Sequence, residues 1–270
     1  MFLEKVAVLK REEIDKRKIL SSLQEMQKKV SDLPAPREFL GAFLNKRPMA
    51  LIAEIKRASP SAGMIRQDAD IRETARKYQA GGASAVSVLT EARFFHGALG
   101  HLAMVKETVS LPVLQKDFIV DPCQIYEGRI AGADALLLIA AILEREELKE
   151  MALLTRVLGM FPLVEVHDEE DLEKIADLEL PLIGINNRNL KTLEVNLENT
   201  FRLIEKIPRG TTVISESGIK TRKDLKRLQK AGVKGVLVGE VLMRAADPAA
   251  KIRELLNPQE NIYLRTSASH

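Results

Sequence analysis

The feature that most constrains the fold is a regular alternation of short apolar runs and amphipathic segments. Eight such runs begin at intervals of roughly 20–35 residues, which is the length of one strand and a crossover helix. The expected strands are residues 50–55, 85–89, 112–116, 135–139, 162–166, 182–186, 212–217 and 235–239. Eight strands, each followed by a helix, within about 220 residues predict a (β/α)₈ TIM barrel more than an open doubly wound sheet.

The residues before the first strand predict an extra helical extension over about 4–46. Apolar side chains recur at helical spacing over residues 4–32, and a second short helix is expected after Pro36. No linker rich in Pro, Gly or Ser divides the chain, so we expect a single barrel domain over residues 1–256. Residues 257–270 turn polar and are expected to form a loosely held tail.

Local signals mark the ends of the helices between the strands. Asp121 and Asp247 each precede a proline, which places an N-cap before Pro at the first helical position. Gly81, Gly132 and Gly232 each follow an alanine a few residues before the next strand, and they are expected to end helices.

The composition narrows the class of protein. The formal charge is only +3, with 41 basic and 38 acidic residues interspersed, which argues against a nucleic-acid-binding surface. Cys123 is the single cysteine, so no internal disulfide is possible, and it is expected to be inert packing. The start of the chain lacks the long apolar stretch of a signal peptide, and the longest apolar run, 135–143, is too short for a membrane span. We therefore expect a cytoplasmic protein.

Polar side chains end several of the expected strands, where buried strands should carry apolar ones. They are Glu54, Lys56, Lys116, Glu165, Asn186 and Glu216. Strand alternation directs these side chains inward, and barrel active sites lie at the carboxyl ends of the strands, so the six are expected to converge on one mouth. A ring of structural ion pairs is less favoured, because buried pairs rarely add net stability over apolar packing.

Lysines and carboxylates together can hold a proton donor and a proton acceptor near neutral pH. A Schiff-base role for Lys116 or Lys56 stays open at this point. The four histidines show no ligand spacing, and the carboxylates alternate with lysines that would repel a cation, so no metal site is expected.

The turns after the seventh and eighth expected strands favour a phosphate. Small residues in 215–219 and 237–240 would let backbone N–H groups approach an anion, and a short helix is expected from about 241. Gly218 and Gly239 could equally be ordinary turn glycines, but two such turns on adjacent strands favour the phosphate. Nearby apolar residues could wall a flat aromatic substrate: Pro60, Phe94, Phe95, Phe118, Leu137 and Ile139.

The segment 52–61, Ile-Ala-Glu-Ile-Lys-Arg-Ala-Ser-Pro-Ser, resembles the signature of the indole-3-glycerol-phosphate synthase family. Further matches follow in order over nearly the whole chain: Thr90-Glu91 with Phe94-Phe95-Gly97, and residues 114–118, 163–167, 184–190 and 215–219. The resemblance implies a carboxy-lyase of tryptophan biosynthesis. It would close 1-(2-carboxyphenylamino)-1-deoxyribulose 5-phosphate to indole-3-glycerol phosphate with loss of CO₂ and water, without a cofactor.

The resemblance also implies roles for the residues. Lys116 would be the general acid in ring closure and Glu165 the acid/base partner in dehydration, while Glu54 and Glu216 orient the lysines and the substrate hydroxyls. Anionic groups would be bound or steered by Lys56, Ser59, Asn186 and Arg188, and the phosphate held by Ser217, Gly218, Gly239 and the backbone of Glu240. Leu190 and Leu237 complete the expected substrate-binding set.

Two alternatives to this interpretation stay open. One is another phosphosugar barrel, resembling phosphoribosylanthranilate isomerase, against which the Glu54–Lys56 pair and Lys116 argue. The other is a non-catalytic binder of a phosphorylated ligand, which has no need of a buried lysine beside a carboxylate from another strand. As partners we expect only a phosphorylated small molecule, with no nucleic acid and no membrane, and a monomer or weak homodimer.

Overall fold

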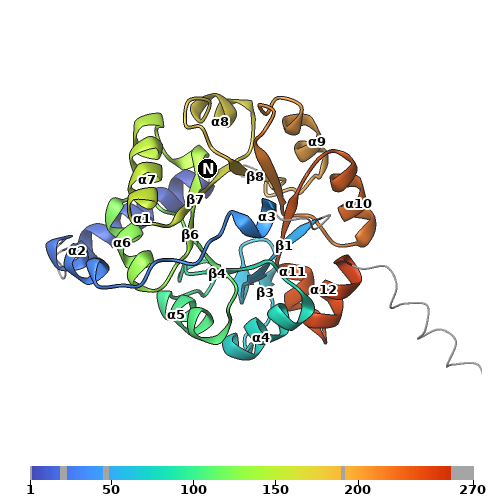
Figure 1. Ribbon diagram of the computed structural model, residues 1–270, viewed down its shortest axis with the longest axis horizontal. Coiled ribbons are helices and arrows are strands. Elements are labelled where there is room, and N and C mark those ends of the chain that lie inside the picture. Colours follow the sequence, from blue (N-terminus) through green and yellow to red (C-terminus); the bar gives the residue numbers. More distant parts are fainter. Residues whose placement is uncertain (1, 19–22, 45–48, 190–191, 257–270) are drawn as a thin grey trace, which may run out of the picture.

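Eight parallel strands close into a barrel, and helices surround it (Figure 1). The computed structural model describes residues 2–18, 23–44, 49–189 and 192–256. Around the barrel the strands lie in the order β1-β10-β9-β8-β7-β6-β5-β4. Their bounds are β1 Ala50–Ile55, β4 Ala85–Leu89, β5 Val113–Lys116, β6 Ala135–Ile139, β7 Phe161–Val166, β8 Leu182–Asn186, β9 Thr212–Glu216 and β10 Gly235–Val238. The predicted (β/α)₈ barrel is confirmed.

A helix follows each barrel strand before the next one begins. These helices are α4 Ile71–Gly81, α5 Leu99–Thr108, α6 Pro122–Ile130, α7 Arg145–Val157, α8 Glu169–Lys174, α9 Glu198–Ile204, α10 Arg222–Lys230 and α12 Pro248–Leu256. Shorter elements lie in the loops: the antiparallel pair β2 Ala58–Ser59 and β3 Gly63–Met64, the 3₁₀ turn η1 Ala140–Ile142, and α11 Glu240–Met243. The extra short helix expected after the last strand is therefore present.

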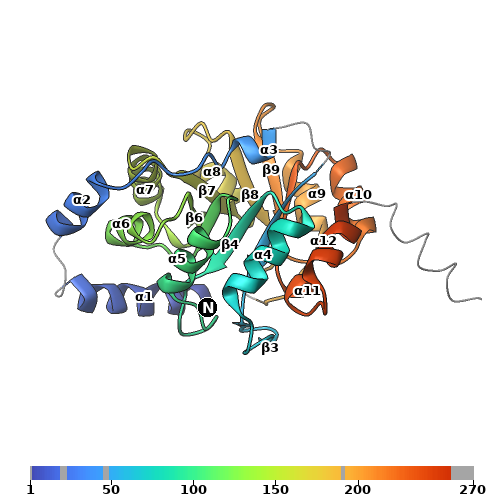
Figure 2. The same ribbon diagram turned by 60° about the horizontal axis from the view of Figure 1, so that its bottom comes forward.

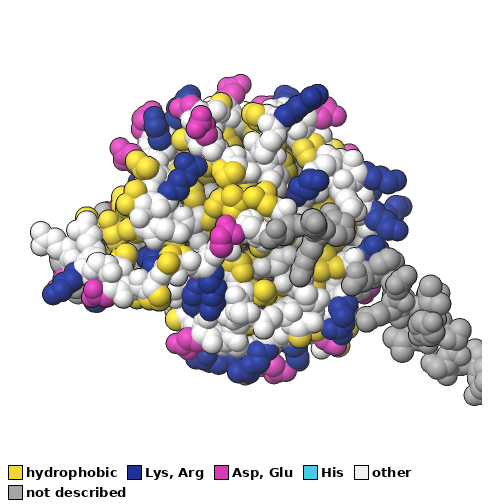
Figure 3. Space-filling view, viewed as in Figure 1, with side chains coloured by type: hydrophobic (Ala, Val, Ile, Leu, Met, Phe, Trp, Pro, Cys, Tyr) yellow, Lys and Arg dark blue, Asp and Glu magenta, His cyan; other side chains and the backbone are white. Residues whose placement is uncertain are grey.

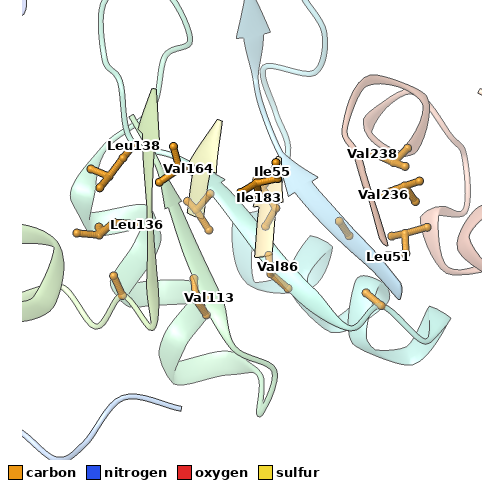
Figure 4. Packing of buried hydrophobic residues seen from close by; sticks show 14 of the residues in the cluster. Leu51, Ile55, Val86, Val113, Leu136, Leu138, Val164, Ile183, Val236 and Val238 are labelled. Carbon is orange, nitrogen blue, oxygen red and sulfur yellow. The ribbon is translucent and has the colours of Figure 1, made fainter. Parts of the chain in front are cut away.

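Strand alternation divides the core into two layers. Leu51, Val86 and Val236 belong to the outer layer, between the strands and the helices, which Figure 4 shows in part. The alternate residues, such as Ile52 and Leu114, fill the barrel interior together with other aliphatic side chains. Both faces of each strand are therefore buried, as the apolar runs of a parallel sheet require.

The N-terminal extension begins with two helices, one on the mouth side of the barrel and one at its flank. The prediction of a single helix over 4–32 was therefore wrong. The two helices are α1 Phe2–Lys18 and α2 Leu23–Ser31, and residues 19–22 between them lie outside the described part of the chain. Figure 2 shows α1 on the same side of the barrel as β3, with α3 (Gly41–Leu44) on the opposite side. The expected short helix after Pro36 is therefore present, beginning at Gly41.

Aromatic side chains before β1 close the end of the barrel opposite the mouth. The Phe39 ring lies 5.1 Å from that of Phe43 and 5.6 Å from that of Phe161, measured between centroids. Arg37 anchors this segment, because its guanidinium donates to the backbone carbonyls of Leu111 and Lys106, each at 2.9 Å. The opposite end is left free for a site.

Helix ends follow the predicted signals with one exception. The Asp121 and Asp247 carboxylates accept backbone N–H groups of the helices that they precede, and Gly132 and Gly232 adopt the left-handed conformation (φ +93°). The exception is Gly81, which was predicted to end α4. The helix is instead ended by Gly82, which has φ +92°. Gly81 instead packs against the backbone of α12, where a side chain would be crowded. In the described ranges no helix is long and apolar enough to cross a membrane.

Candidate active site

A cavity of about 320 Å³ opens at the carboxyl ends of the barrel strands. All six of the predicted polar residues line it: Glu54, Lys56, Lys116, Glu165, Asn186 and Glu216. Strand alternation explains the convergence. Glu54 lies on the same face of β1 as Ile52, which fills the barrel interior, and Glu165 likewise follows Leu163 on β7. The six side chains that were predicted to converge on one mouth therefore line a single cavity.

Lys116 is the centre of this cluster. Its Nζ lies 3.0 Å from Oε2 of Glu165 and 3.1 Å from Oε2 of Glu216, so β5, β7 and β9 each supply one member. Glu54 and Lys56 form a second pair on β1, with Oε2 and Nζ 2.7 Å apart. The three carboxylates are almost completely buried, at 1–3% exposure. Buried charges of this kind persist only when they are paired.

Burial and mutual contact shift the pKa values of the cluster. Burial lowers the pKa of Lys116, but Glu165, Glu216 and Glu54 together raise it above its ordinary value. Burial raises the pKa of Glu165, yet the charges of Lys116 and His167 bring it well below 4.5. Burial raises the pKa of Glu216, and the charge of Glu165 raises it further, while Lys116 lowers it. The result is a pKa of about 8, so Glu216 holds its proton more tightly than Glu165 does. Around Lys116 the site thus holds one cation, one carboxylate and one carboxyl group that titrates near neutrality, beside the Glu54–Lys56 pair.

Two glycines make room for these carboxylates. A Cβ atom at Gly184 on β8 would overlap Oε1 of Glu216, and one at Gly239 would overlap Oε2 of Glu54. Oε1 of Glu216 lies in the space that Gly184 leaves, where it is buried and has no hydrogen-bond partner within the described residues. Gly239 was predicted only as a phosphate contact, and Gly184 was not singled out.

The other predicted substrate-binding residues mostly line the same cavity. Those that do are Ser59, Pro60, Phe118, Leu137, Ile139, Arg188, Ser217, Gly218, Leu237, Gly239 and Glu240. Phe94 does not: it lines a second cavity against α1, and its neighbour Phe95 takes the place at the mouth. Leu190 lies outside the described residues.

Glu91 explains why Phe95 and not Phe94 faces the mouth. Its carboxylate accepts the backbone N–H groups of Arg93, Phe94 and Phe95 at 2.9, 2.7 and 3.1 Å. These bonds curl the loop after β4 into a tight turn and fix the direction of each side chain. A glutamate two residues after a strand end was the available signal for this turn.

One end of the cavity is suited to an anion. Ser217 and Gly218 both have positive φ, at +65° and +82°, which turns the chain sharply after β9. Lys220 and Arg244 also line this end, although the sequence pattern had not singled them out. The Glu240 carboxylate accepts from Nε of Arg244 at 3.0 Å. Figure 3, which views the end of the barrel covered by α3 and opposite the mouth, shows Lys and Arg side chains in dark blue along the edge where α10 lies.

The residues that the structure describes hold no group of three or more His, Cys, Asp or Glu side chains placed to bind a metal ion. The polar residues that line the cavity supply ammonium and guanidinium groups, carboxylates, an amide and hydroxyls. Such a set can donate protons, accept them and bind anions.

A TIM barrel with a buried lysine–carboxylate cluster at its mouth belongs to the class of acid–base barrel enzymes. The family model of indole-3-glycerol phosphate synthase matches residues 3–255, and the chain belongs to this family. It is therefore a carboxy-lyase with indole-3-glycerol-phosphate synthase activity, which acts in tryptophan biosynthesis.

Similar proteins include the indole-3-glycerol phosphate synthase of Desulforamulus reducens, 47% identical, with 95% of this chain and 97% of the relative covered. The enzyme of the same name from Dehalococcoides mccartyi is 46% identical, with 95% and 100% covered. Among solved structures, KGPDC from Streptococcus mutans matches with a TM-score of 0.58 and 11% identity, covering 77% of this chain and 95% of that one. Thiamine phosphate pyrophosphorylase from Pyrococcus furiosus matches at 0.57 and 18%, covering 77% and 94%. The last two similarities concern the fold alone.

Proposed function

We propose that Lys116, Glu165 and their neighbours close the indole ring of 1-(2-carboxyphenylamino)-1-deoxyribulose 5-phosphate by general acid–base catalysis. The observation that carries this proposal is the Lys116 ammonium, held 3.0 Å from Glu165 and 3.1 Å from Glu216 at the barrel mouth. The acidic groups around Lys116 raise its pKa and keep the ammonium charged until a substrate oxygen arrives, so it can act as an acid toward that oxygen.

In the first step the ring carbon that bears the carboxylate attacks the ribulose carbonyl carbon, and Lys116 protonates the carbonyl oxygen. The carboxylate then leaves as CO₂, and its bonding electrons restore the aromatic ring. In the second step the new hydroxyl group leaves as water, and a proton is lost from the neighbouring ring carbon. Glu165, held ionised by Lys116, is the group that accepts or returns protons in this dehydration.

The two ends of the substrate are held apart by different parts of the mouth. The turns at Ser217, Gly218 and Gly239 bind the phosphate, with the backbone N–H of Glu240. Lys56 and Arg188 bind or steer the anthranilate carboxylate from the other side. Anchoring both ends keeps the reacting carbons close, which converts the ring closure into a favourably oriented intramolecular step.

Apolar side chains hold the aromatic ring between these anchors. Phe118, Leu137 and Ile139 line the cavity beside the cluster, and Phe95 adds a second aromatic face. Glu216 lines the same cavity, and its carboxyl group orients a substrate hydroxyl. A flat, apolar ring with polar groups at both ends matches this distribution.

The test is to mix the purified chain with the substrate and follow the fluorescence of the indole product. We expect rapid product formation with wild-type protein and far slower formation with Lys116→Ala. Tight binding without product in the wild type would favour the non-catalytic binder. Isomerisation of phosphoribosylanthranilate, assayed in parallel, would favour the isomerase-like alternative.

We further propose that residues 1–256 form one domain and that the chain acts in the cytoplasm. The polar segment 257–270, expected as a loosely held tail, lies outside the described residues. We propose a monomer or weak homodimer without a nucleic-acid partner; the formal charge of only +3 supports the last point. Sedimentation velocity over a hundredfold concentration range, with and without duplex DNA, tests the assembly and the absence of binding.

A further inference from the structure

His167 lies directly behind the acid–base cluster, two residues after Glu165. Its side chain is buried, and it is not among the residues that line the cavity. Nε2 of His167 lies 3.1 Å from Oε1 of Glu165, and Nδ1 lies 3.3 Å from Oδ2 of Asp171. The Glu165 carboxylate therefore has a cation within ion-pair distance of each oxygen: Lys116 donates a hydrogen bond to Oε2, and His167 lies beside Oε1 without the alignment of a hydrogen bond.

The imidazole is fixed in this position by the loop and helix that follow β7. Asp171 belongs to the first turn of α8, and its carboxylate also accepts the backbone N–H of His167 at 2.8 Å. Asp168 caps that helix and accepts the N–H of Asp171. From α9 the Asn199 side chain donates to the carbonyl oxygen of His167 at 3.0 Å. The ring is thus held from both its backbone and its Nδ1 side.

We propose that His167 is a positioning residue for the ring-closing reaction, which as an imidazolium holds Oε1 of Glu165 so that Oε2 is aimed at Lys116 and the substrate. This inference rests on the role proposed above for Glu165. A carboxylate contacted at one oxygen only can rotate, whereas one held at both is fixed in the orientation that proton transfer needs. The role belongs to the pair of residues 165 and 167, which strand alternation places on the same face.

The charge state of His167 agrees with this geometry. Burial lowers the pKa of His167, but the contacts with Asp171 and Glu165 raise it to about 9. The groups that face it are Glu165 from β7 and Asp171 from α8, with Lys116 of β5 beyond Glu165. At neutral pH the ring therefore carries its proton, and it loses this proton as the pH rises past 9.

Two variants separate positioning from packing. His167→Gln keeps a donor of similar reach but removes the charge, and Asp171→Asn keeps an acceptor for the backbone while removing the charge that holds the proton on His167. His101→Gln is the matched control, because His101 lies on α5 and does not line the cavity. Glu216 stays intact in all variants, so its own titration is common to them.

The measurement is kcat and KM for indole product formation between pH 6 and pH 10, with unfolding followed on the same samples. We expect His167→Gln to lower kcat at pH 7 by about tenfold or more, with KM changed by less than about threefold. We expect wild-type kcat to decline near pH 9, where His167 loses its proton, and we expect this decline to be absent in His167→Gln and to move to lower pH in Asp171→Asn. His101→Gln should retain the wild-type profile.

Wild-type kcat and pH profile in His167→Gln, or an unmoved alkaline decline in Asp171→Asn, would overturn the inference. If His167→Gln does not fold, the shift in Asp171→Asn decides. Failure of the proposed function itself has a different signature, because wild-type protein would then give no product at any pH.

Discussion

At the scale of single residues, the site depends on one ammonium group shared between the side chains of two glutamates. Lys116 contacts Glu165 and Glu216, which approach from β7 and β9. A buried charge that loses its partner costs about 3–5 kcal/mol, so each member of such a cluster constrains the other two. The low pKa of Glu165 and the raised pKa of Glu216 are two consequences of this sharing.

Replacement of Lys116 by alanine should abolish the acid without unfolding the chain. Glu165 and Glu216 can share one proton in its absence, which limits the electrostatic cost. We expect kcat to fall by about 10²–10⁴-fold, the usual contribution of a general acid. The measurement is steady-state fluorescence of the product, and Lys149→Ala, at an exposed lysine of α7, is the control. A Lys116→Ala enzyme within tenfold of wild type would remove Lys116 from its assigned role.

Gly184 is expected to matter through the space that it leaves. A methyl group there would overlap Oε1 of Glu216 and displace that carboxyl from Lys116. Gly184→Ala should therefore lower kcat by about tenfold or more, while the free energy of unfolding falls by only ~1–3 kcal/mol. Product kinetics and urea unfolding are the measurements. Unchanged kcat together with a normal fold would contradict the packing argument.

At the scale of secondary structure, each barrel strand could be predicted to within one residue at either end, because apolar runs and polar ends both mark it. The N-terminal extension was harder. A continuous helical pattern over 4–32 does not reveal that the chain divides into α1 and α2. The predicted end of α4 was wrong by one residue, because the sequence alone does not show which of two adjacent glycines ends the helix. Only packing against α12 and backbone φ distinguish them.

These adjacent glycines give a prediction about stability. Gly82 has φ +92° with no atom near its Cβ position, so Gly82→Ala should lower the free energy of unfolding by ~1 kcal/mol through backbone strain alone. Gly82→Asn should cost less, because asparagine tolerates this conformation better. Gly81→Ala should also destabilise, since its Cβ would lie 3.0 Å from the Ala249 backbone.

Gly100→Ala is the control for this series. Gly100 lies within α5, at ordinary φ and with open space around its Cβ position, so the same change should stabilise by ~0.5–1 kcal/mol. Urea unfolding of the four variants gives the comparison. Equal losses in Gly82→Ala and Gly82→Asn would show that left-handed strain is not the cause.

At the scale of the whole molecule, the convergence of distant residues was predictable and their pairing was not. Parallel strands bring all their carboxyl ends to one mouth, so the location of Lys116 and Glu165 followed from the fold class. Which oxygen meets which nitrogen depends on the stagger of strands around the barrel and on loops that no spacing rule fixes. The contact of His167 with Glu165 and the position of Phe94 away from the mouth both arise there.

The same cluster makes the stability of the molecule depend on pH. Glu216 has its pKa raised from 4.5 to about 8, so between these values the folded chain holds a proton that the unfolded chain releases. His167 acts in the same direction: its stabilising contribution is complete below pH 6.5 and is lost as the pH rises through about 9. Glu165 opposes them only in acid, since its lowered pKa stabilises above 4.5 and that gain is lost below. Stability should therefore fall from pH 5.5 to pH 9, by on the order of 1–3 kcal/mol.

Glu216→Gln isolates the main contributor to this slope. Glutamine is neutral at every pH. The free energy of unfolding of the variant should therefore depend less on pH between 5.5 and 8, and the variant should be more stable than wild type near pH 8. Glu169→Gln is the control: Glu169 pairs with Arg202 and Lys206 at the surface, which lowers its pKa to about 2. It is ionised in both folded and unfolded chains over this window, so its loss should leave the slope unchanged. The measurement is the urea midpoint of the wild type and of both variants at three pH values. If stability changes with pH in Glu216→Gln as it does in the wild type, the cluster does not hold the extra proton. Because the same carboxyl group is assigned to the substrate, the variant should gain stability at the expense of turnover.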